Sequence, residues 1–292
     1  PSVLDRAELV MGAPPCEAVP LDVQIHAEER LEGYVRRTIS FAVEPGDRVP
    51  AYLLIPNGAR RAPAAVCLHQ TTKMGKAEPV GLGLKNLAYA KELAERGFVA
   101  LAPDYPNFGD YKVDVYARGW ASATRKGIWN HMRAVDVLRA MPEVDPEKIA
   151  AIGHSLGGHN AIFLGAFDPR VKAVVSSCGF TAFPKYMRGN LAGWSHKGYM
   201  PRIAERYGKD PARMPFDFTD LVASLAPRAF FANAPTRDDN FEVSGVRDVF
   251  DAARPAYAGI EDRLVAEHPD AGHDFPPDVR ERAYAFLKKA LY

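Results

Sequence analysis

The stretch Ile149–Ala161 reads Ile-Ala-Ala-Ile-Gly-His-Ser-Leu-Gly-Gly-His-Asn-Ala. An apolar run typical of a buried strand ends in a Gly-x-Ser-x-Gly turn centred on Ser155, and the helix-like run Leu156–Phe167 follows it. So sharp a turn forces its central residue into strained backbone geometry, and glycines at positions 153 and 157 let the neighbouring backbones pass. The stretch therefore predicts a strand–turn–helix elbow that raises the Ser155 hydroxyl above the end of a sheet.

Strand-like and helix-like runs alternate on both sides of this elbow. The predicted strands are Tyr34–Val43, Val49–Ile55, Ala64–Leu68, Phe98–Ala102, Ile149–Ile152, Val171–Ser177, Ala229–Asn233 and Leu264–His268. The other predicted helices are Leu84–Arg96, Trp120–Met141, Val243–Tyr257 and Pro277–Leu291. Short, nearly all-apolar strands separated by helices are typical of a mostly parallel, twisted sheet with helices on both faces. The sequence thus predicts one α/β domain over residues 34–292.

Two segments lie outside this alternation. Residues 1–33 are predicted to form an N-terminal arm with one short helix at Val19–Arg30, and the first two strands to form a hairpin at a sheet edge. The segment Cys178–Ala226 is a long irregular insertion rich in aromatic, Gly and Pro residues. It leaves the strand next to the elbow strand, so we expect it to lie near the mouth of the site. Phe183, Tyr186 and Trp194, together with Tyr105, are predicted to line an aromatic substrate pocket, and the alternative is that they form the core of the insertion.

Composition excludes several classes of protein. The chain has 292 residues, 47% of them hydrophobic and 25% charged, and its 37 Lys and Arg nearly balance its 36 Asp and Glu. These values are ordinary for a globular protein and indicate neither nucleic acid nor an anionic membrane as a partner. Cys16, Cys67 and Cys178 are odd in number and widely spaced, which predicts neither a disulfide framework nor a zinc motif. Oligomeric state stays open.

No apolar run approaches the roughly 20 residues that span a bilayer. The N-terminus also lacks a charged segment followed by an apolar core. The composition therefore favours a cytoplasmic protein slightly, while Pro1 in first place is compatible with removal of an upstream signal peptide.

Polar residues that follow the predicted strands are candidates for catalysis, because open α/β sheets bind ligands at the carboxyl ends of their strands. Ser155, the pair Asp238 and Asp239, and His273 all occupy such positions. A serine hydroxyl needs a base to take its proton, and a histidine base needs a carboxylate to hold its tautomer. These requirements predict Ser155 as nucleophile and His273 as base, with either aspartate within reach of the imidazole.

The oxyanion that forms when a serine attacks a carbonyl group also needs hydrogen-bond donors. The N–H of Leu156 is predicted to supply one, and the N–H of Gln70, in the loop after Ala64–Leu68, to supply a second. The ring of His69 is expected to brace that loop. His154 and His159 are interpreted as packing or rim residues.

Three motifs together resemble the α/β-hydrolase superfamily, and within it the dienelactone hydrolase and prolyl-oligopeptidase-like branch. They are Gly153–Gly158, Asp238–Asn240 and Gly272–Phe275, and the resemblance covers about residues 34–292. It implies that Asp238, the first aspartate of its run, is the catalytic acid. Dienelactone hydrolases proper carry a cysteine where this chain has Ser155, and the chain has no room for the propeller of prolyl oligopeptidases. The resemblance therefore implies a compact serine esterase.

The sequence hypothesis is a serine carboxylic-ester hydrolase that acts through an acyl-enzyme on small or medium esters, with acylated carbohydrates among the candidates. It requires no metal or organic cofactor. One alternative is a serine peptidase or amidase with the same triad, although the gating domain of the related peptidases is absent. Another is a non-catalytic binding module on the same fold, against which the intact Ser, Asp and His argue.

Overall fold

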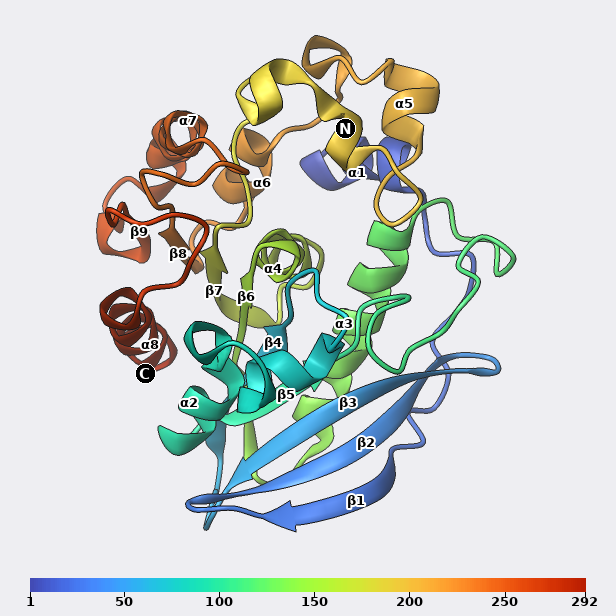
Figure 1. The fold of residues 1–292 in the computed structure, drawn as a ribbon, viewed down its shortest axis with the longest axis vertical. Coiled ribbons are helices and arrows are strands. Elements are labelled where there is room, and N and C mark those ends of the chain that lie inside the picture. Colours follow the sequence, from blue (N-terminus) through green and yellow to red (C-terminus); the bar gives the residue numbers. More distant parts are fainter.

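Strand β6 (Val144–His154), which ends at the elbow, lies within a nine-stranded sheet in the computed structural model, which describes residues 1–292 (Figure 1). The strand order is β1-β2-β3-β5-β4-β6-β7-β8-β9. All pairs from β5 to β9 are parallel, whereas β1–β2, β2–β3 and β3–β5 are antiparallel. The predicted α/β class with a mostly parallel sheet is therefore confirmed.

The bounds of the elements agree closely with the predicted runs in the centre of the chain. The other strands are β1 (Gln24–Arg30), β2 (Tyr34–Glu44), β3 (Asp47–Pro56), β4 (Ala62–Leu68), β5 (Val99–Pro103), β7 (Val171–Ser177), β8 (Ala229–Asn233) and β9 (Leu264–Glu267). The α-helices are α1 (Val3–Met11), α2 (Tyr89–Glu95), α3 (Ala123–Ala140), α4 (Leu156–Phe167), α5 (Arg202–Tyr207), α6 (Phe218–Ser224), α7 (Val243–Ala253) and α8 (Pro277–Leu291). None of them is both long enough and apolar enough to cross a lipid bilayer.

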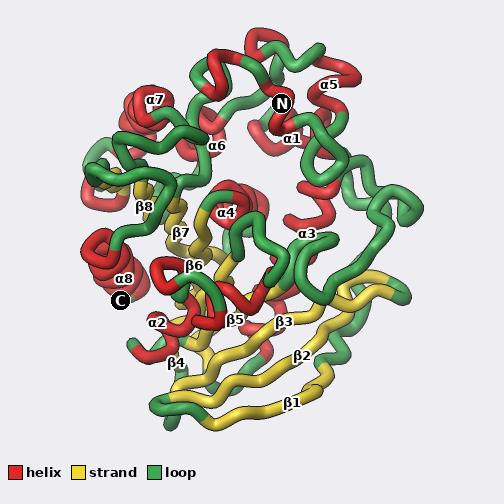
Figure 2. The backbone as a smooth tube through the Cα atoms, in the orientation of Figure 1, coloured by secondary structure: helices red, strands yellow, loops and turns green.

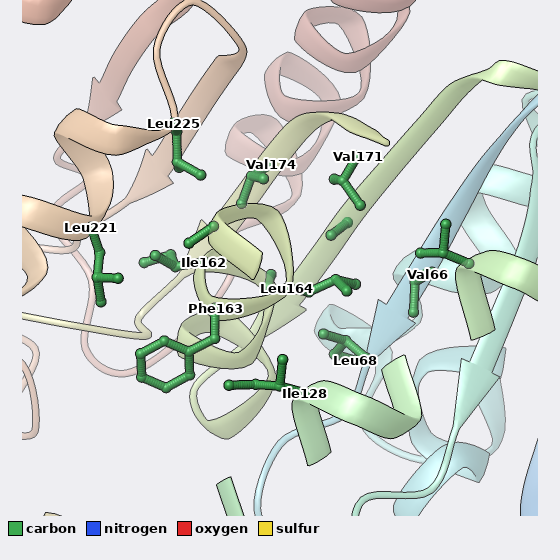
Figure 3. Close-up of a cluster of buried hydrophobic side chains, with 14 of the residues drawn as sticks. Val66, Leu68, Ile128, Ile162, Phe163, Leu164, Val171, Val174, Leu221 and Leu225 are labelled. Atoms are coloured by element: carbon green, nitrogen blue, oxygen red, sulfur yellow. The ribbon is translucent and has the colours of Figure 1, made fainter. Parts of the chain in front are cut away.

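Helices cover both faces of the sheet and enclose a separate core on each. Helices α3, α4 and α7 bury apolar side chains on one face, and α2 and α8 do so on the other. In Figure 3, Ile162 and Phe163 of α4 lie in the first core with Val174 of β7 and Leu221 of α6. Because α4 is apolar on all sides, it is buried on all sides. This burial fixes the N-terminus of α4 at the carboxyl end of β6.

The predicted helix at Val19–Arg30 is wrong. The second half of this segment is β1, an exposed strand that pairs with β2 and makes the sheet edge, so the hairpin β2–β3 lies one strand further in. Its local composition is helix-like, but Glu28 and Glu29 form ion pairs with Arg37 and Arg36 across the strands. Such cross-strand pairs stabilise a strand through residues distant in sequence.

Two further expectations change. The predicted helix Leu84–Arg96 is regular only from Tyr89, after a short 3₁₀ turn. The insertion after β7 contains α5 and α6 and is not irregular throughout, and α1 packs beside both. Arg6 of α1 binds Asp220 of α6 at 2.9 Å. In Figure 2, by contrast, the connection from β5 to α3 consists almost wholly of loop.

Candidate active site

The elbow has the strained geometry that its sequence predicts. Ser155 lies between β6 and α4 with φ 53° and ψ −116°, a conformation that non-glycine residues rarely adopt. A Cβ atom on Gly153 would lie 2.2 Å from the carbonyl oxygen of Gly157, and one on Gly157 would lie 1.9 Å from that of Leu68. Only glycine fits at either position. The two close contacts press the start of α4 against the ends of β6 and β4.

His273 and Asp238 form a hydrogen-bonded pair beyond the ends of β8 and β9. Nδ1 of His273 lies 3.0 Å from Oδ1 and 3.1 Å from Oδ2 of Asp238, whose side chain is 1% exposed. Burial by itself would raise the pKa of Asp238, but hydrogen bonds from His273 and from the N–H groups of Asn240 and Phe241 hold that pKa below its usual value. Asp239 points into solvent. Of the two candidate carboxylates, Asp238 is therefore the one that contacts the imidazole.

Asn233, at the end of β8, holds the loop that carries His273. Its Nδ2 donates to the carbonyl oxygen of Asp274 at 2.9 Å and to Oγ of Ser177 at 2.8 Å. Ser177 Oγ in turn contacts Nδ1 of His154, whose ring centre lies 4.9 Å from that of His273. Burial lowers the pKa of His154 to about 3, so this ring packs against His273 as a neutral group. No sequence motif marked Asn233, because its partners come from distant segments.

Two backbone donors remain free at the elbow. The N–H groups of Leu156 and Gln70 donate to no backbone acceptor, as expected for the first residue of a helix and for a residue just past a strand. The close contact between Gly157 and Leu68 brings the two chain segments together. An anion above the start of α4 would be stabilised by such donors and by the helix dipole.

His69 braces this loop, as predicted. Its Nε2 accepts a hydrogen bond from the N–H of Tyr105 at 2.9 Å, so its Nδ1 carries the proton and donates to the carbonyl oxygen of Gln70 at 2.6 Å. Burial lowers the pKa of His69, which keeps the ring neutral and this tautomer in place.

Comparison with known proteins supports the fold described above. The sequence model of the dienelactone hydrolase family matches residues 49–190, which include the elbow. The glucuronoyl esterase from Solibacter usitatus superimposes with a TM-score of 0.76 at 17% identity, over 99% of this chain and 91% of that one. The chain has the α/β-hydrolase fold. The predicted resemblance is thereby confirmed.

Other proteins similar to this chain carry related names. The putative hydrolase YtaP of Bacillus subtilis is 25% identical over 93% of each chain. A 4-O-methyl-glucuronoyl methylesterase of Hypocrea jecorina is 24% identical over 59% of this chain, and the match spans 41% of that protein. Acetyl xylan esterase 1 of Thermoanaerobacterium superimposes with a TM-score of 0.67 at 19% identity, over 99% of this chain and 93% of that one.

A buried carboxylate ties the loop that contains Gln70 to the loop after β5. Asp104 is fully buried and accepts hydrogen bonds from the N–H of Lys76 at 2.7 Å, from Lys76 Nζ at 2.9 Å and from the N–H of Asp110 at 3.0 Å. Lys76 itself is 2% exposed and also pairs with Asp110. Asp104 therefore joins the segments on either side of the site.

Replacing Asp104 by Ala should destabilise the protein by about 3–5 kcal/mol, because it leaves a buried ammonium group without its buried partner. Asp110→Ala is the matched control. Its carboxylate binds the same lysine but is 79% exposed, so its loss should cost less than about 1 kcal/mol. Urea unfolding of both variants measures the difference. Equal losses would contradict a specific role for Asp104.

The predicted aromatic pocket residues are mostly packed into the core of the insertion. Phe183, Trp194 and Tyr105 are 1%, 3% and 3% exposed, and Trp194 lies against Phe183, Tyr186 and other rings. Tyr105 donates its hydroxyl to the carbonyl oxygen of Gly198 at 2.9 Å, and only Tyr186 is partly open. Apolar rings in one short segment pack against each other because this contact removes their surface from water. A substrate role for these residues stays a prediction.

Trp194→Ala should lower the free energy of unfolding by about 3–5 kcal/mol, because it removes a large buried side chain. Such a loss would assign Trp194 to the core of the insertion, which is the alternative to the predicted substrate pocket. Lys197→Ala, at an exposed position of the same insertion, should change stability by less than about 0.5 kcal/mol. The denaturant midpoints of Trp194→Ala, Lys197→Ala and wild type measure this difference in stability. An unchanged midpoint with altered ester preference would assign Trp194 to substrate binding.

Proposed function

We propose that this chain is a serine carboxylic-ester hydrolase with Ser155 as nucleophile, His273 as base and Asp238 as the acid that orients it. The observation that carries the proposal is the arrangement at one end of the sheet. A serine held at φ 53° on an elbow is accompanied by a histidine whose Nδ1 lies 3.0 Å from a buried carboxylate. The Ser, Asp, His order along the chain is that of α/β-hydrolase triads.

The reaction follows from the properties of these groups. Because Asp238 accepts the Nδ1 proton of His273, Nε2 is left to take the proton of Ser155 as its oxygen attacks the ester carbonyl. The N–H groups of Leu156 and Gln70 stabilise the oxyanion. Collapse of the tetrahedral intermediate expels the alcohol, to which His273 returns the proton. Water, activated by the same imidazole, then hydrolyses the acyl-enzyme.

Small or medium esters, with acylated carbohydrates among them, are the proposed substrates. The names of the relatives support carbohydrate esters. A cleft of about 840 Å³ between Pro106–Tyr116 and the insertion residues Lys197 and Gly198 supports a substrate larger than a simple acyl group. Val115 lines this cleft and belongs to the same apolar cluster as Leu156, the residue next to the nucleophile.

A panel of p-nitrophenyl esters of increasing acyl length, set against p-nitroanilide peptides, tests the proposal. We expect ester turnover without anilide turnover. Anilide turnover would favour an amidase instead, and turnover of neither class would favour a non-catalytic module. Turnover of an O-acetylated xyloside would show that a sugar is accepted on the alcohol side of the ester. Turnover of a methyl glucuronate would show that a sugar is accepted on the acyl side. Ser155→Ala protein is the control for contaminating esterase.

A further inference from the structure

Three potential metal ligands from separate segments meet beside the nucleophile. His154 ends β6, Cys178 follows β7, and His273 lies in the loop after β9. One donor atom from each side chain lies within 4.8 Å of the other two. The three residues are far apart in sequence, so no metal-binding motif predicts that they lie together.

Both imidazoles are held in the way that metal-ligating histidines usually are. Nδ1 of His273 is engaged by Asp238 at 3.0 Å, and Nδ1 of His154 is engaged by Oγ of Ser177 at 2.8 Å. Each ring thus keeps Nε2 free of any protein partner. An outer hydrogen bond on one ring nitrogen fixes the orientation of the ring and makes the other nitrogen a better ligand.

The thiol of Cys178 lies beside the carboxylate of Asp238 and makes two further sulfur contacts. Its Sγ lies 3.3 Å from the carbonyl oxygen of Asp274 and 3.8 Å from Nδ2 of Asn233, and these are weak sulfur contacts. The backbone of Cys178 has φ 48°, a left-handed conformation that costs energy in a non-glycine residue. Strained residues concentrate at functional sites, and a metal here would replace the two sulfur contacts and the interaction of the thiol with Asp238.

We propose that His154, Cys178 and His273 form an inhibitory site for a thiophilic divalent cation such as Zn²⁺ or Cd²⁺. Two imidazole nitrogens and one thiolate would fill three positions of a tetrahedral ion, with a water molecule in the fourth. Ligands at ordinary Zn–N and Zn–S lengths are about 3.5 Å apart, so closure needs side-chain movements on the order of 1 Å. Binding releases the thiol proton to solvent and changes no oxidation state. Mg²⁺ prefers oxygen ligands and should not bind.

Inhibition follows from the identity of one ligand. Nε2 of His273 cannot hold a cation and accept the proton of Ser155 at the same time. This consequence rests on the proposed function, whereas cation binding itself does not. Cation binding is therefore measured separately from ester hydrolysis, so that a failure of the proposed binding site can be told apart from a failure of the proposed function.

Cobalt(II) is the probe for binding, because a thiolate ligand gives it a charge-transfer absorption in the near ultraviolet. The full-length wild-type chain titrated with Co²⁺ should show that band at one equivalent, and Zn²⁺ should abolish it by displacement. Cys178→Ser should lack the band. Cys67→Ser is the matched control, since Cys67 is also buried but is not one of the three grouped ligands, and it should keep the band. No band in wild type, or an unchanged band in Cys178→Ser, overturns the proposal.

His154→Asn supplies a second variant should the cysteine change disturb folding. It should weaken Co²⁺ binding at least tenfold with an unchanged circular dichroism spectrum, in line with the usual loss of affinity around a metal site. Unaltered affinity would refute the three-ligand site.

In the ester assay, Zn²⁺ should inhibit wild type and Cys67→Ser equally, Cys178→Ser at least tenfold less, and EDTA should restore the rate. Equal inhibition of Cys178→Ser would overturn the inhibitory role. If no ester is turned over, the proposed function fails, while the cobalt titration still decides the binding site.

Discussion

Ser155→Ala should reduce the rate of ester hydrolysis by roughly 10⁴- to 10⁶-fold and leave the fold intact. Its hydroxyl is the attacking group, and removal of the nucleophile from a serine triad costs about this much because the remaining groups act only as a unit. Alanine keeps the Cβ atom that already sits at φ 53°, so the substitution adds no new backbone strain. The expected result is a collapse of kcat with an unchanged unfolding midpoint.

Covalent labelling with a fluorophosphonate identifies the nucleophilic serine directly. Wild type should be labelled at one equivalent, and mass spectrometry should place the label on the peptide that contains Ser155. The Ala variant should not react. A label on any other serine, or residual activity within tenfold of wild type, would remove Ser155 from the mechanism.

Asp238→Asn should lower kcat by about 10⁴-fold, comparable to the corresponding change in a serine protease triad. An asparagine can present its NH₂ group to Nδ1 of His273, which moves the imidazole proton to Nε2 and leaves no base for the hydroxyl of Ser155. The contact that this change disrupts is the one at 3.0 Å between Nδ1 and Oδ1.

Asp239→Asn is the matched control, because the neighbouring carboxylate is exposed and does not contact His273. It should retain activity within a few-fold of wild type. Both variants are to be compared at the same mildly alkaline pH, with a circular dichroism spectrum of each. The reverse ranking would assign the acid to Asp239.

The elbow could be predicted from the sequence because its causes are local. Gly153 and Gly157 are required by contacts within a few residues of Ser155 and by the strand beside it. The short apolar strands were equally readable, since a strand buried on both faces carries its signal in its own residues. The resemblance added one choice that spacing left open, namely Asp238, and in the structure this carboxylate contacts His273.

The predictions that differ from the structure concern segments whose conformation depends on contacts with residues distant in sequence. Residues 24–30 are charged and locally helix-like, but they form an edge strand through ion pairs with β2. Trp194 was predicted to line a substrate pocket; in the structure it packs against the rings of its own insertion, and a substrate role stays a prediction. Composition tells that a segment is aromatic, but only packing tells which side of each ring faces solvent.

The sequence by itself determined the α/β alternation, the elbow at Ser155 and the residue types of the triad, because strand burial, turn strain and proton transfer each demand particular residues at short range. The structure shows that Asp238, the acid that the resemblance implied, reaches His273. Only the tertiary structure decided how Asn233 and Asp104 hold the loops around the site and that His154, Cys178 and His273 converge. These contacts join segments separated by tens of residues. Their geometry depends on the order of strands in the sheet, which no local pattern encodes.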